Sequence, residues 1–94
     1  MEQDKNTLLV LLQRKLLITW SSVETNEELS RIIEDAIPAM QDKIGDNEID
    51  FSQPGRERNL FLEYCKYQWN DYGYVFDREN RGEIIALRIK HGNT

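Results

Sequence analysis

The amino-acid sequence predicts an all-α protein: a small bundle of three to four helices with an ordered loop after the first helix and a short C-terminal helix or tail. Three observations support this fold class. Apolar residues repeat at helical spacing, residues that cap helices precede these segments, and glycines follow them. The chain has 94 residues without repeats, low-complexity tracts or long linkers, so we expect a single domain over residues 1–94.

The first helix is expected over about residues 7–17. Leucines recur on one of its faces at helical spacing, and Asn6 or Thr7 supplies its cap. The segment that follows, ITWSSVE (residues 18–24), combines β-branched residues, Trp20 and two serines. We interpret this segment as the ordered loop.

The second helix is expected over about residues 25–44. The letters TNEE form a capping box, in which the side chains of Thr25 and Glu28 bond each other's backbone amides. Gly45 then ends the helix in a left-handed cap. Pro38 projects opposite the apolar stripe, so the pattern predicts one bent helix, with two shorter helices as the alternative. The stripe consists of Leu29, Ile32, Ile33, Ala36, Ile37, Met40 and Ile44.

The third helix is expected over about residues 54–72. It follows an acidic, turn-rich connection, GDNEIDF (residues 45–51). Ser52 is its predicted cap, and Pro54 is tolerated in its first turn. Gly73 is expected to end it.

Seven of the nine aromatic residues lie between Leu60 and Phe76. On a helical wheel, the apolar side chains of the third helix cover about 220°, against about 100–140° for a helix that packs on one side. Leu62 and Trp69 form one shoulder of this arc and Tyr67 the other. We expect the shoulders to be buried against another subunit, which makes these three residues the predicted subunit interface. The alternative is that the N-terminal helix and the tail of the same chain cover them.

The last helix is expected over about residues 78–90, capped by Asp77 and weakened by Gly82. Its apolar residues fit no single face, because Ile84 and Ile85 point to different sides. A tail that becomes ordered only on a partner is therefore the alternative.

Charge and composition exclude several classes of function. The net charge is −5, and residues 21–51 alone carry −7, so the basic footprint of a general nucleic-acid binder is absent. The single cysteine, Cys65, excludes an intrachain disulfide and suits a reducing compartment. The apolar run LLVLL is too short for a membrane span, and acids precede it, which does not fit a signal peptide. We expect a soluble intracellular protein.

No catalytic or metal-binding constellation is predicted. His91 is the only histidine and lies near the end of the chain, where we interpret it as a solvated tail residue. Cys65 falls on the core face of the third helix and is interpreted as a buried structural thiol. The acidic segment DNEID (residues 46–50) lacks the glycine and the final glutamate of a calcium loop, so we interpret it as a solvated turn. We expect no enzyme, no cofactor and no metal.

The order and character of these elements resemble the small helical head–tail connector (adaptor, head-completion) proteins of tailed bacteriophages and prophages. The resemblance runs from Leu16 to His91. It is carried by LLITW, ETNEELSRIIEDA, IDFSQPGRERNLFLEYCKYQWND and EIIALRIKHG, in this order. No single piece is a strict motif, and the specificity lies in the combination: a long capped helix, an acidic turn with Phe51 and Ser52, and a tyrosine-rich third helix.

The resemblance implies a structural virion protein that is assembled in the host cytoplasm and lies at the head–tail junction. An all-α protomer would join a ring of roughly a dozen copies beneath the portal protein after DNA packaging. The ring would extend the exit channel and present a docking surface to the next head-closure or tail-proximal protein. DNA would pass through without sequence-specific binding. The isolated protein can be a monomer.

The resemblance also suggests roles for particular residues. The C-terminal segment would engage the portal or another partner through Arg78, Arg81, Ile84, Ile85, Leu87 and Arg88. Acids that face the channel would repel DNA phosphates, and the candidates are Glu27, Glu28, Asp35, Asp42, Asp46 and Glu48. A solvated helix face is the alternative for these acids. Two other functions stay open: a small helical DNA-binding regulator and a stand-alone protein–protein adaptor.

Overall fold

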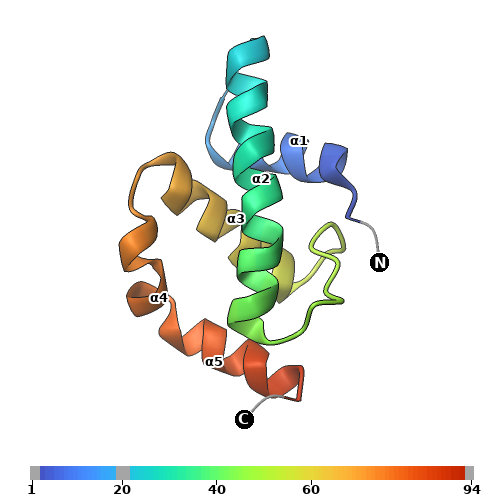
Figure 1. Cartoon of the computed structure of the whole chain (residues 1–94), viewed down its shortest axis with the longest axis vertical. Helices are drawn as coiled ribbons and strands as arrows, with labels where there is room; N and C mark the ends of the chain where they lie inside the picture. Colours follow the sequence, from blue (N-terminus) through green and yellow to red (C-terminus); the bar gives the residue numbers. More distant parts are fainter. Residues whose placement is uncertain (1–2, 19–21, 93–94) are drawn as a thin grey trace.

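The computed structural model describes residues 3–18 and 22–92, and within these residues all regular structure is helical. The predicted all-α class is therefore confirmed. The elements are α1 (Lys5–Lys15), α2 (Val23–Ile44), α3 (Arg56–Trp69), the 3-10 turn η1 (Gly73–Val75), α4 (Phe76–Glu79) and α5 (Arg81–Lys90). The long helix α2 runs most of the length of the molecule. In Figure 1, α1 lies to its right, α3 passes behind it, α4 lies to its left and α5 runs across its lower end.

Helix α1 begins earlier than predicted. Its cap is Asp4 and not Asn6 or Thr7: the Asp4 carboxylate accepts hydrogen bonds from the amide and the hydroxyl of Thr7, at 3.1 and 2.8 Å. A carboxylate caps more strongly here because it also lies at the positive end of the helix dipole. After α1, the backbone amide of Ile18 bonds to the Gln13 carbonyl, which closes the helix. The remainder of the predicted ordered loop, Trp20 included, lies outside the described residues.

Helix α2 is a single helix, as predicted, and it continues through Pro38. The predicted capping box is wrong. Ser22 is the cap, and its hydroxyl accepts from the amide of Thr25 at 3.1 Å, so the helix begins two residues earlier. Ser22 is the cap because its backbone is extended, with φ −136° and ψ 156°, as a cap requires. Thr25 already lies in the first turn of the helix. Gly45 ends the helix in the left-handed conformation, with φ 89°, which confirms that prediction.

Helix α3 is shorter than predicted at both ends. It begins at Arg56, so Pro54 lies before it, and Ser52 does not cap it. The amide of Ser52 bonds instead to the Asp50 carboxylate at 3.0 Å, which folds the acidic connection into a local turn. The prediction of a solvated turn is therefore only partly correct, because Ile49 and Phe51 are buried in the core.

The end of α3 is also corrected. The helix ends at Trp69, and Asp71 adopts a left-handed conformation, with φ 61°. The amide of Tyr72 then bonds to the Tyr67 carbonyl at 2.8 Å, which satisfies one of the last carbonyls of the helix. Gly73 therefore does not cap α3, and a β-carbon at this position would displace the terminal amide of the Gln68 side chain.

The last part of the chain forms two helices where one was predicted. Asp77 lies inside α4 and does not cap a helix, and Asn80 separates α4 from α5. Helix α5 ends at Lys90, as predicted. The alternative of a tail that is ordered only on a partner is wrong, because Leu87 of α5 is fully buried in the core of its own chain.

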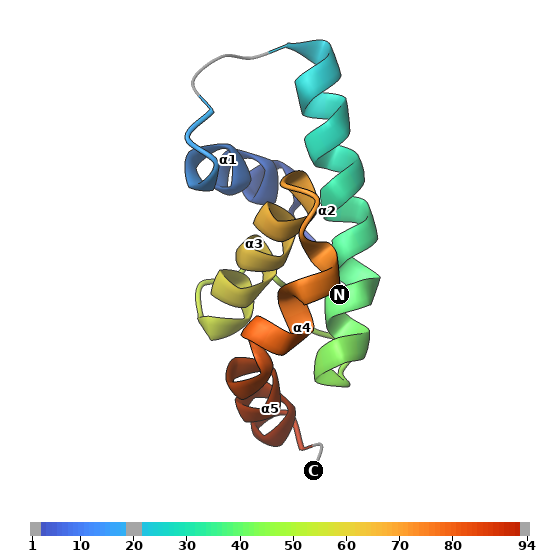
Figure 2. The same ribbon diagram turned by 90° about the vertical axis from the view of Figure 1, so that its left-hand side faces the viewer.

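One hydrophobic core joins all of the helices. The rings of Phe51 and Phe61 stack with their centroids 4.7 Å apart, which fastens the connection after α2 to α3. Tyr64 and Tyr67 meet Phe76 edge-on, at 4.9 and 5.3 Å, which fastens α4 to α3. Figure 2 shows α1, α3 and α4 lying on one side of α2.

The chain itself covers most of the wide apolar arc of α3. Leu62 is buried, on a helix that packs against α1, so its predicted place in a subunit interface is wrong. Tyr67 packs against Phe76, and Trp69 is half-buried at the edge of the core beside the first turn of α2. The sharp turn after Trp69 brings α4 back over α3, which the helical wheel does not reveal. Tyr67 and Trp69 have partial exposure left, so their interface role stays a prediction.

Replacing Leu87 with alanine tests the anchoring of α5. Because Leu87 is fully buried, we expect Leu87→Ala to lower the free energy of unfolding by about 2–5 kcal/mol, measured by urea denaturation. The matched control is Ile85→Ala on the exposed side of the same helix, which we expect to change it by about 0.5 kcal/mol or less. Equal effects of the two substitutions would contradict the assignment of Leu87 to the core.

Candidate functional site

A groove of about 660 Å³ lies between the end of α2 and the segment from η1 to α5. We call it the arginine groove. It is lined by Asp42, Lys43, Tyr74, Asp77, Arg78, Arg81, Ile84, Ile85 and Arg88. The fold therefore brings together five of the six residues predicted to dock a partner. The sixth, Leu87, points into the core, so its predicted docking role is wrong.

Part of the arginine groove is occupied by contacts within the chain. The ammonium group of Lys43 pairs with the Asp77 carboxylate at 2.8 Å and lies 5.7 Å from the centre of the Tyr64 ring. Arg88 donates from Nη1 to the backbone carbonyl of Lys43 at 2.8 Å. Carbonyls at the end of a helix lack partners within the helix and carry partial negative charge, so Arg88 stabilises the end of α2. Arg88 is thus a structural cation more than a free docking group.

The other two guanidinium groups in the groove belong to Arg78 and Arg81. Arg78 and Arg81 are exposed and form no ion pair within residues 3–18 and 22–92. The same groove is lined by Tyr74, whose exposed fraction is 81%, and by Ile85, at 47%. Apolar surface beside unpaired cations is typical of a contact with another macromolecule.

The predicted channel acids differ in their surroundings. Glu28, Asp35 and Asp42 are exposed, and because they repeat every seven residues they form one row along α2. Glu27 and Glu48 are exposed as well, outside this row. The sixth candidate, Asp46, is half-buried and engaged by a hydrogen bond, so it is no free channel acid.

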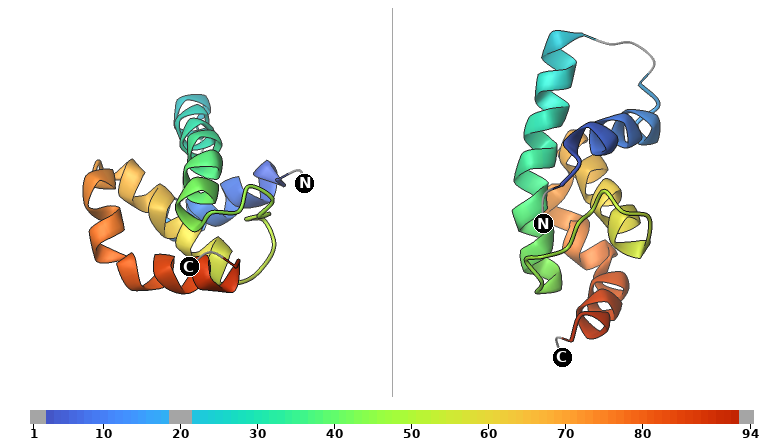
Figure 3. Two further views of the ribbon diagram at one scale, coloured as in Figure 1. Left: turned by 60° about the horizontal axis from the view of Figure 1, so that its bottom comes forward. Right: turned by 90° about the vertical axis from the view of Figure 1, so that its right-hand side faces the viewer.

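The carboxylate of Asp46 belongs to a cluster that fastens the end of α5. Nδ1 of His91 lies 2.8 Å from Oδ2 of Asp46, and Nε2 lies 2.7 Å from Oε2 of Glu57. Lys90 also contacts Glu57, at 2.7 Å. We call Asp46, Glu57 and His91 the histidine clasp. Figure 3 shows α5 running across the end of α2 and the start of α3, which the clasp connects.

The histidine clasp overturns the interpretation of His91 as a solvated tail residue. Only 17% of its side chain is exposed. An ionised carboxylate only accepts hydrogen bonds, so a ring that bonds two carboxylates must donate from both nitrogens, which requires the imidazolium form. No local pattern in the sequence points to this cluster, because its members lie in three elements that are far apart along the chain.

The pKa values of the clasp follow from its geometry. Burial alone would lower the pKa of His91, but the hydrogen bonds to Glu57 and Asp46 outweigh it and raise the pKa. Burial alone would raise the pKa of Glu57, but the hydrogen bonds from Lys90 and His91 lower it to about 2. Hydrogen bonds from the Glu48 amide and from His91 lower the pKa of Asp46. All three shifts favour the charged cluster.

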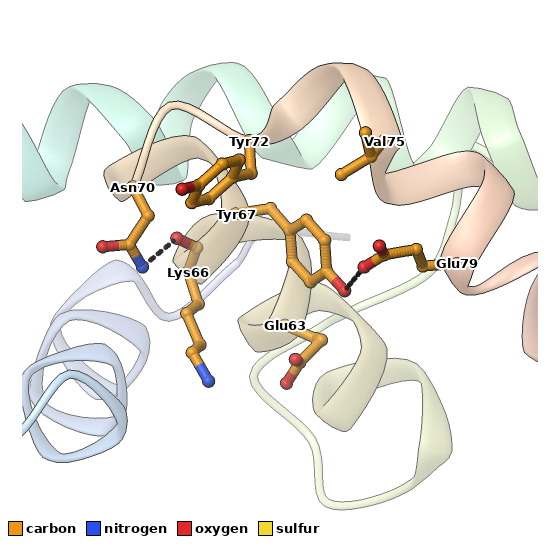
Figure 4. Close-up of a pocket in the computed structure, with 7 residues that line it drawn as sticks. All are labelled: Glu63, Lys66, Tyr67, Asn70, Tyr72, Val75 and Glu79. Atoms are coloured by element: carbon orange, nitrogen blue, oxygen red, sulfur yellow. Dashed lines mark hydrogen bonds between the residues drawn. The ribbon is translucent and has the colours of Figure 1, made fainter.

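A second hollow, of about 390 Å³, lies where α3 meets η1 and α4 (Figure 4). We call it the tyrosine recess. It is lined by Glu63, Lys66, Tyr67, Asn70, Tyr72, Val75 and Glu79. Its polar groups are largely engaged within the chain: the Tyr67 hydroxyl donates to Glu79 at 2.6 Å, and Lys15 pairs with Glu63 at 2.7 Å. The recess is therefore a junction between helices, where Tyr67 joins α3 to α4.

Two other sequence-based expectations concern chemistry. Cys65 is fully buried, as predicted, and burial raises the pKa of its thiol to about 12, so the reactive thiolate is suppressed. Within the part of the chain that the structure describes, no group of three or more metal-ligating side chains is arranged to hold an ion. In the same residues, no helix has both the length and the apolar character that crossing a bilayer demands.

Comparison with known proteins gives no relative from which a function could be transferred. Neither a protein-family model, nor a curated protein, nor a solved structure matches the chain. The resemblance to head–tail connectors therefore rests on the residues quoted above.

We expect the stability of the protein to fall as the pH rises through the folded-state pKa of His91. That pKa lies above the unfolded value of 6.5, so the clasp contributes fully below pH 6.5 and is lost above the folded-state pKa. Urea denaturation midpoints from about pH 5 to about pH 9 measure this fall. His91→Gln should remove most of the pH dependence in this range. An unchanged pH dependence in this variant would mean that another group is responsible.

Removing the Tyr67 hydroxyl tests the junction in the tyrosine recess. We expect Tyr67→Phe to lower the midpoint of unfolding slightly, because Glu79 loses its hydrogen-bond donor while the ring packing is kept. The control is Tyr72→Phe, which removes a hydroxyl from an exposed ring and should have almost no effect. Thermal or urea unfolding measures both, and a neutral Tyr67→Phe would show that the hydrogen bond does not hold α4.

Proposed function

We propose that this protein is a structural subunit of the head–tail connector of a tailed bacteriophage or prophage, located in the virion at the head–tail junction. The observation that carries the proposal is the arginine groove. Residues of the C-terminal segment that the resemblance assigns to docking line one hollow, beside unpaired Arg78 and Arg81 and exposed Tyr74. In this proposal, the groove is the surface that a partner occupies in the assembled ring.

The distribution of the acids suits the same role. In the proposed ring, the row of Glu28, Asp35 and Asp42 along α2 faces the channel. DNA carries a dense row of negative phosphates, so a lumen lined by carboxylates repels it and lets it slide. The portal protein and a head-closure or tail-proximal protein are the proposed neighbours above and below the ring.

The rival role of DNA-binding regulator is less well supported. The free cations Arg78 and Arg81 lie beside exposed apolar side chains, and Asp42 and Asp77 share the groove. Such a mixed surface suits a protein partner better than a phosphate backbone, which attracts a continuous basic face.

Genome context and electron microscopy test the proposal. We expect portal and major capsid genes upstream of this gene and tail genes downstream. Negative-stain images of the protein, mixed with purified portal protein from the same genome, should show an added ring layer. A portal without this layer at high protein concentration would contradict the proposed function. A gel-shift experiment at about 100 mM salt should show no retention of duplex DNA, and retention would support the regulator instead.

Replacing Trp69 separates its two predicted roles. We expect Trp69→Ala to weaken the added layer, because part of this ring stays exposed on the isolated chain. The same change should lower the free energy of unfolding by about 1–3 kcal/mol, since the ring also packs against the core. If only stability falls and assembly is unchanged, Trp69 is a core residue and no interface residue.

A further inference from the structure

A second surface of the same molecule, at the start of α2, is complementary in charge to the arginine groove. The first turns of α2 carry Val23, which is 73% exposed, and the exposed carboxylates of Glu24 and Glu27. We call these three residues the acidic tip. Neither carboxylate forms an ion pair within the described ranges 3–18 and 22–92. Figure 2 shows this part of α2 projecting beyond the rest of the molecule.

The two surfaces match in charge and in apolar character. The acidic tip offers two unpaired carboxylates beside one exposed aliphatic side chain. The arginine groove offers two unpaired guanidinium groups, on Arg78 and Arg81, beside exposed Tyr74 and Ile85. Glu24 and Glu27 lie three residues apart along the chain, and so do Arg78 and Arg81. The two carboxylates and the two guanidinium groups therefore have the same spacing in sequence.

The tip of one chain cannot reach the groove of the same chain. The tip lies at the start of α2, whereas Asp42 and Lys43, which line the groove, lie near its end. A helix rises about 1.5 Å per residue, so the two surfaces are separated by about 25–30 Å along α2. Their complementarity can be satisfied only between two molecules.

We propose that the arginine groove binds the acidic tip of a second copy of this chain. Val23 packs against Tyr74 and Ile85, while Glu24 and Glu27 pair with Arg78 and Arg81. The inference deepens the proposed function, on which it rests for its biological meaning, by naming the neighbouring subunit as the occupant of the groove. It assigns the groove to this neighbour and not to the portal. It also takes Glu27, in the tip, and Asp42, which lines the groove, out of the predicted channel lining.

This contact joins two different surfaces, so it does not close a dimer. Each molecule that uses its groove still presents a free tip, and the other still presents a free groove. Repetition of such a head-to-tail contact gives a closed ring when the rotation between subunits returns to the start, and a filament when it does not. Exposed ion pairs are weak and are screened by salt, so we expect assembly to require high protein concentration and to decline with added salt.

Charge reversal tests the contact from both sides. The groove variant is Arg78→Glu/Arg81→Glu, and the tip variant is Glu24→Lys/Glu27→Lys. In sedimentation velocity at about 50 mM salt, the wild-type protein should sediment faster as its concentration rises. Each variant alone should associate about tenfold more weakly, since the loss of two ion pairs of about 0.7 kcal/mol each corresponds to this factor.

Mixing the two variants distinguishes a specific contact from general charge effects. In an equimolar mixture, the intact tip of the groove variant can bind the intact groove of the tip variant, and the reversed tip of the tip variant can bind the reversed groove of the groove variant. Both contacts between unlike chains are complementary, so we expect the mixture to associate again, with the two chains alternating. The chain that carries all four substitutions restores complementarity and should associate again. A mixture that stays monomeric, or a fourfold variant that does not recover, would overturn the proposal.

A matched control keeps the net charge of the groove variant. Arg14→Glu/Lys66→Glu reverses two exposed cations away from the groove and should associate as the wild-type protein does. Circular dichroism confirms that each variant is folded. A wild-type protein that remains monomeric at every concentration, or a groove variant that associates normally, would also contradict the contact.

Experiments with the portal protein distinguish the connector function from the contact between tip and groove. A portal that gains a ring layer from the groove variant as readily as from the wild-type protein would leave the connector function standing and refute the tip-and-groove contact. A groove variant that self-associates normally but no longer adds to the portal would identify the portal as the occupant and would also refute it. Complementary self-association without any layer on the portal would refute the connector function alone.

Discussion

The packing of Phe76 against two tyrosine rings of α3 determines where the last third of the chain lies. The phenyl ring is fully buried, and Tyr64 and Tyr67 meet it edge-on. This contact holds α4 against α3, and α5 then continues across the end of α2. Because one wall of the arginine groove, the segment from η1 to α5, follows that course, the groove exists only as long as the chain turns back after Trp69. The concentration of aromatic residues in α3 therefore serves mainly to stabilise the fold, because these rings hold α4 against α3.

Much of the fold could be predicted from the sequence because its determinants are local. The apolar stripe and the final glycine of α2 define the end of that helix, and the structure agrees. Helix starts were harder: Asp4 and Ser22 act as caps only because their own backbones are not helical, and neighbouring Thr7 and Thr25 have equally suitable side chains. The early end of α3 depends on a left-handed Asp71, which no spacing rule indicates.

The candidate site was predicted in part, for a physical reason. Arg78 and Arg81 are long, charged and near a chain end, so exposure is their expected state. Ile85 and Leu87 could not be distinguished, because the side of α5 that faces the core depends on the break at Asn80 and on the position of α2. His91 was misjudged for the same reason: Asp46 and Glu57, its partners, are brought to it only by the folded arrangement of three helices.

The burial of Cys65 has a practical consequence. It is the only cysteine of the chain, it is fully enclosed by the core, and burial raises its pKa to about 12. The thiolate is the nucleophile that attacks an alkylating reagent, so Cys65 does not react until the helices separate around it. The rate at which an alkylating reagent modifies the intact protein therefore acts as a clock for transient opening. Because the chain has a single thiol, this rate reports directly how often the interior opens to water.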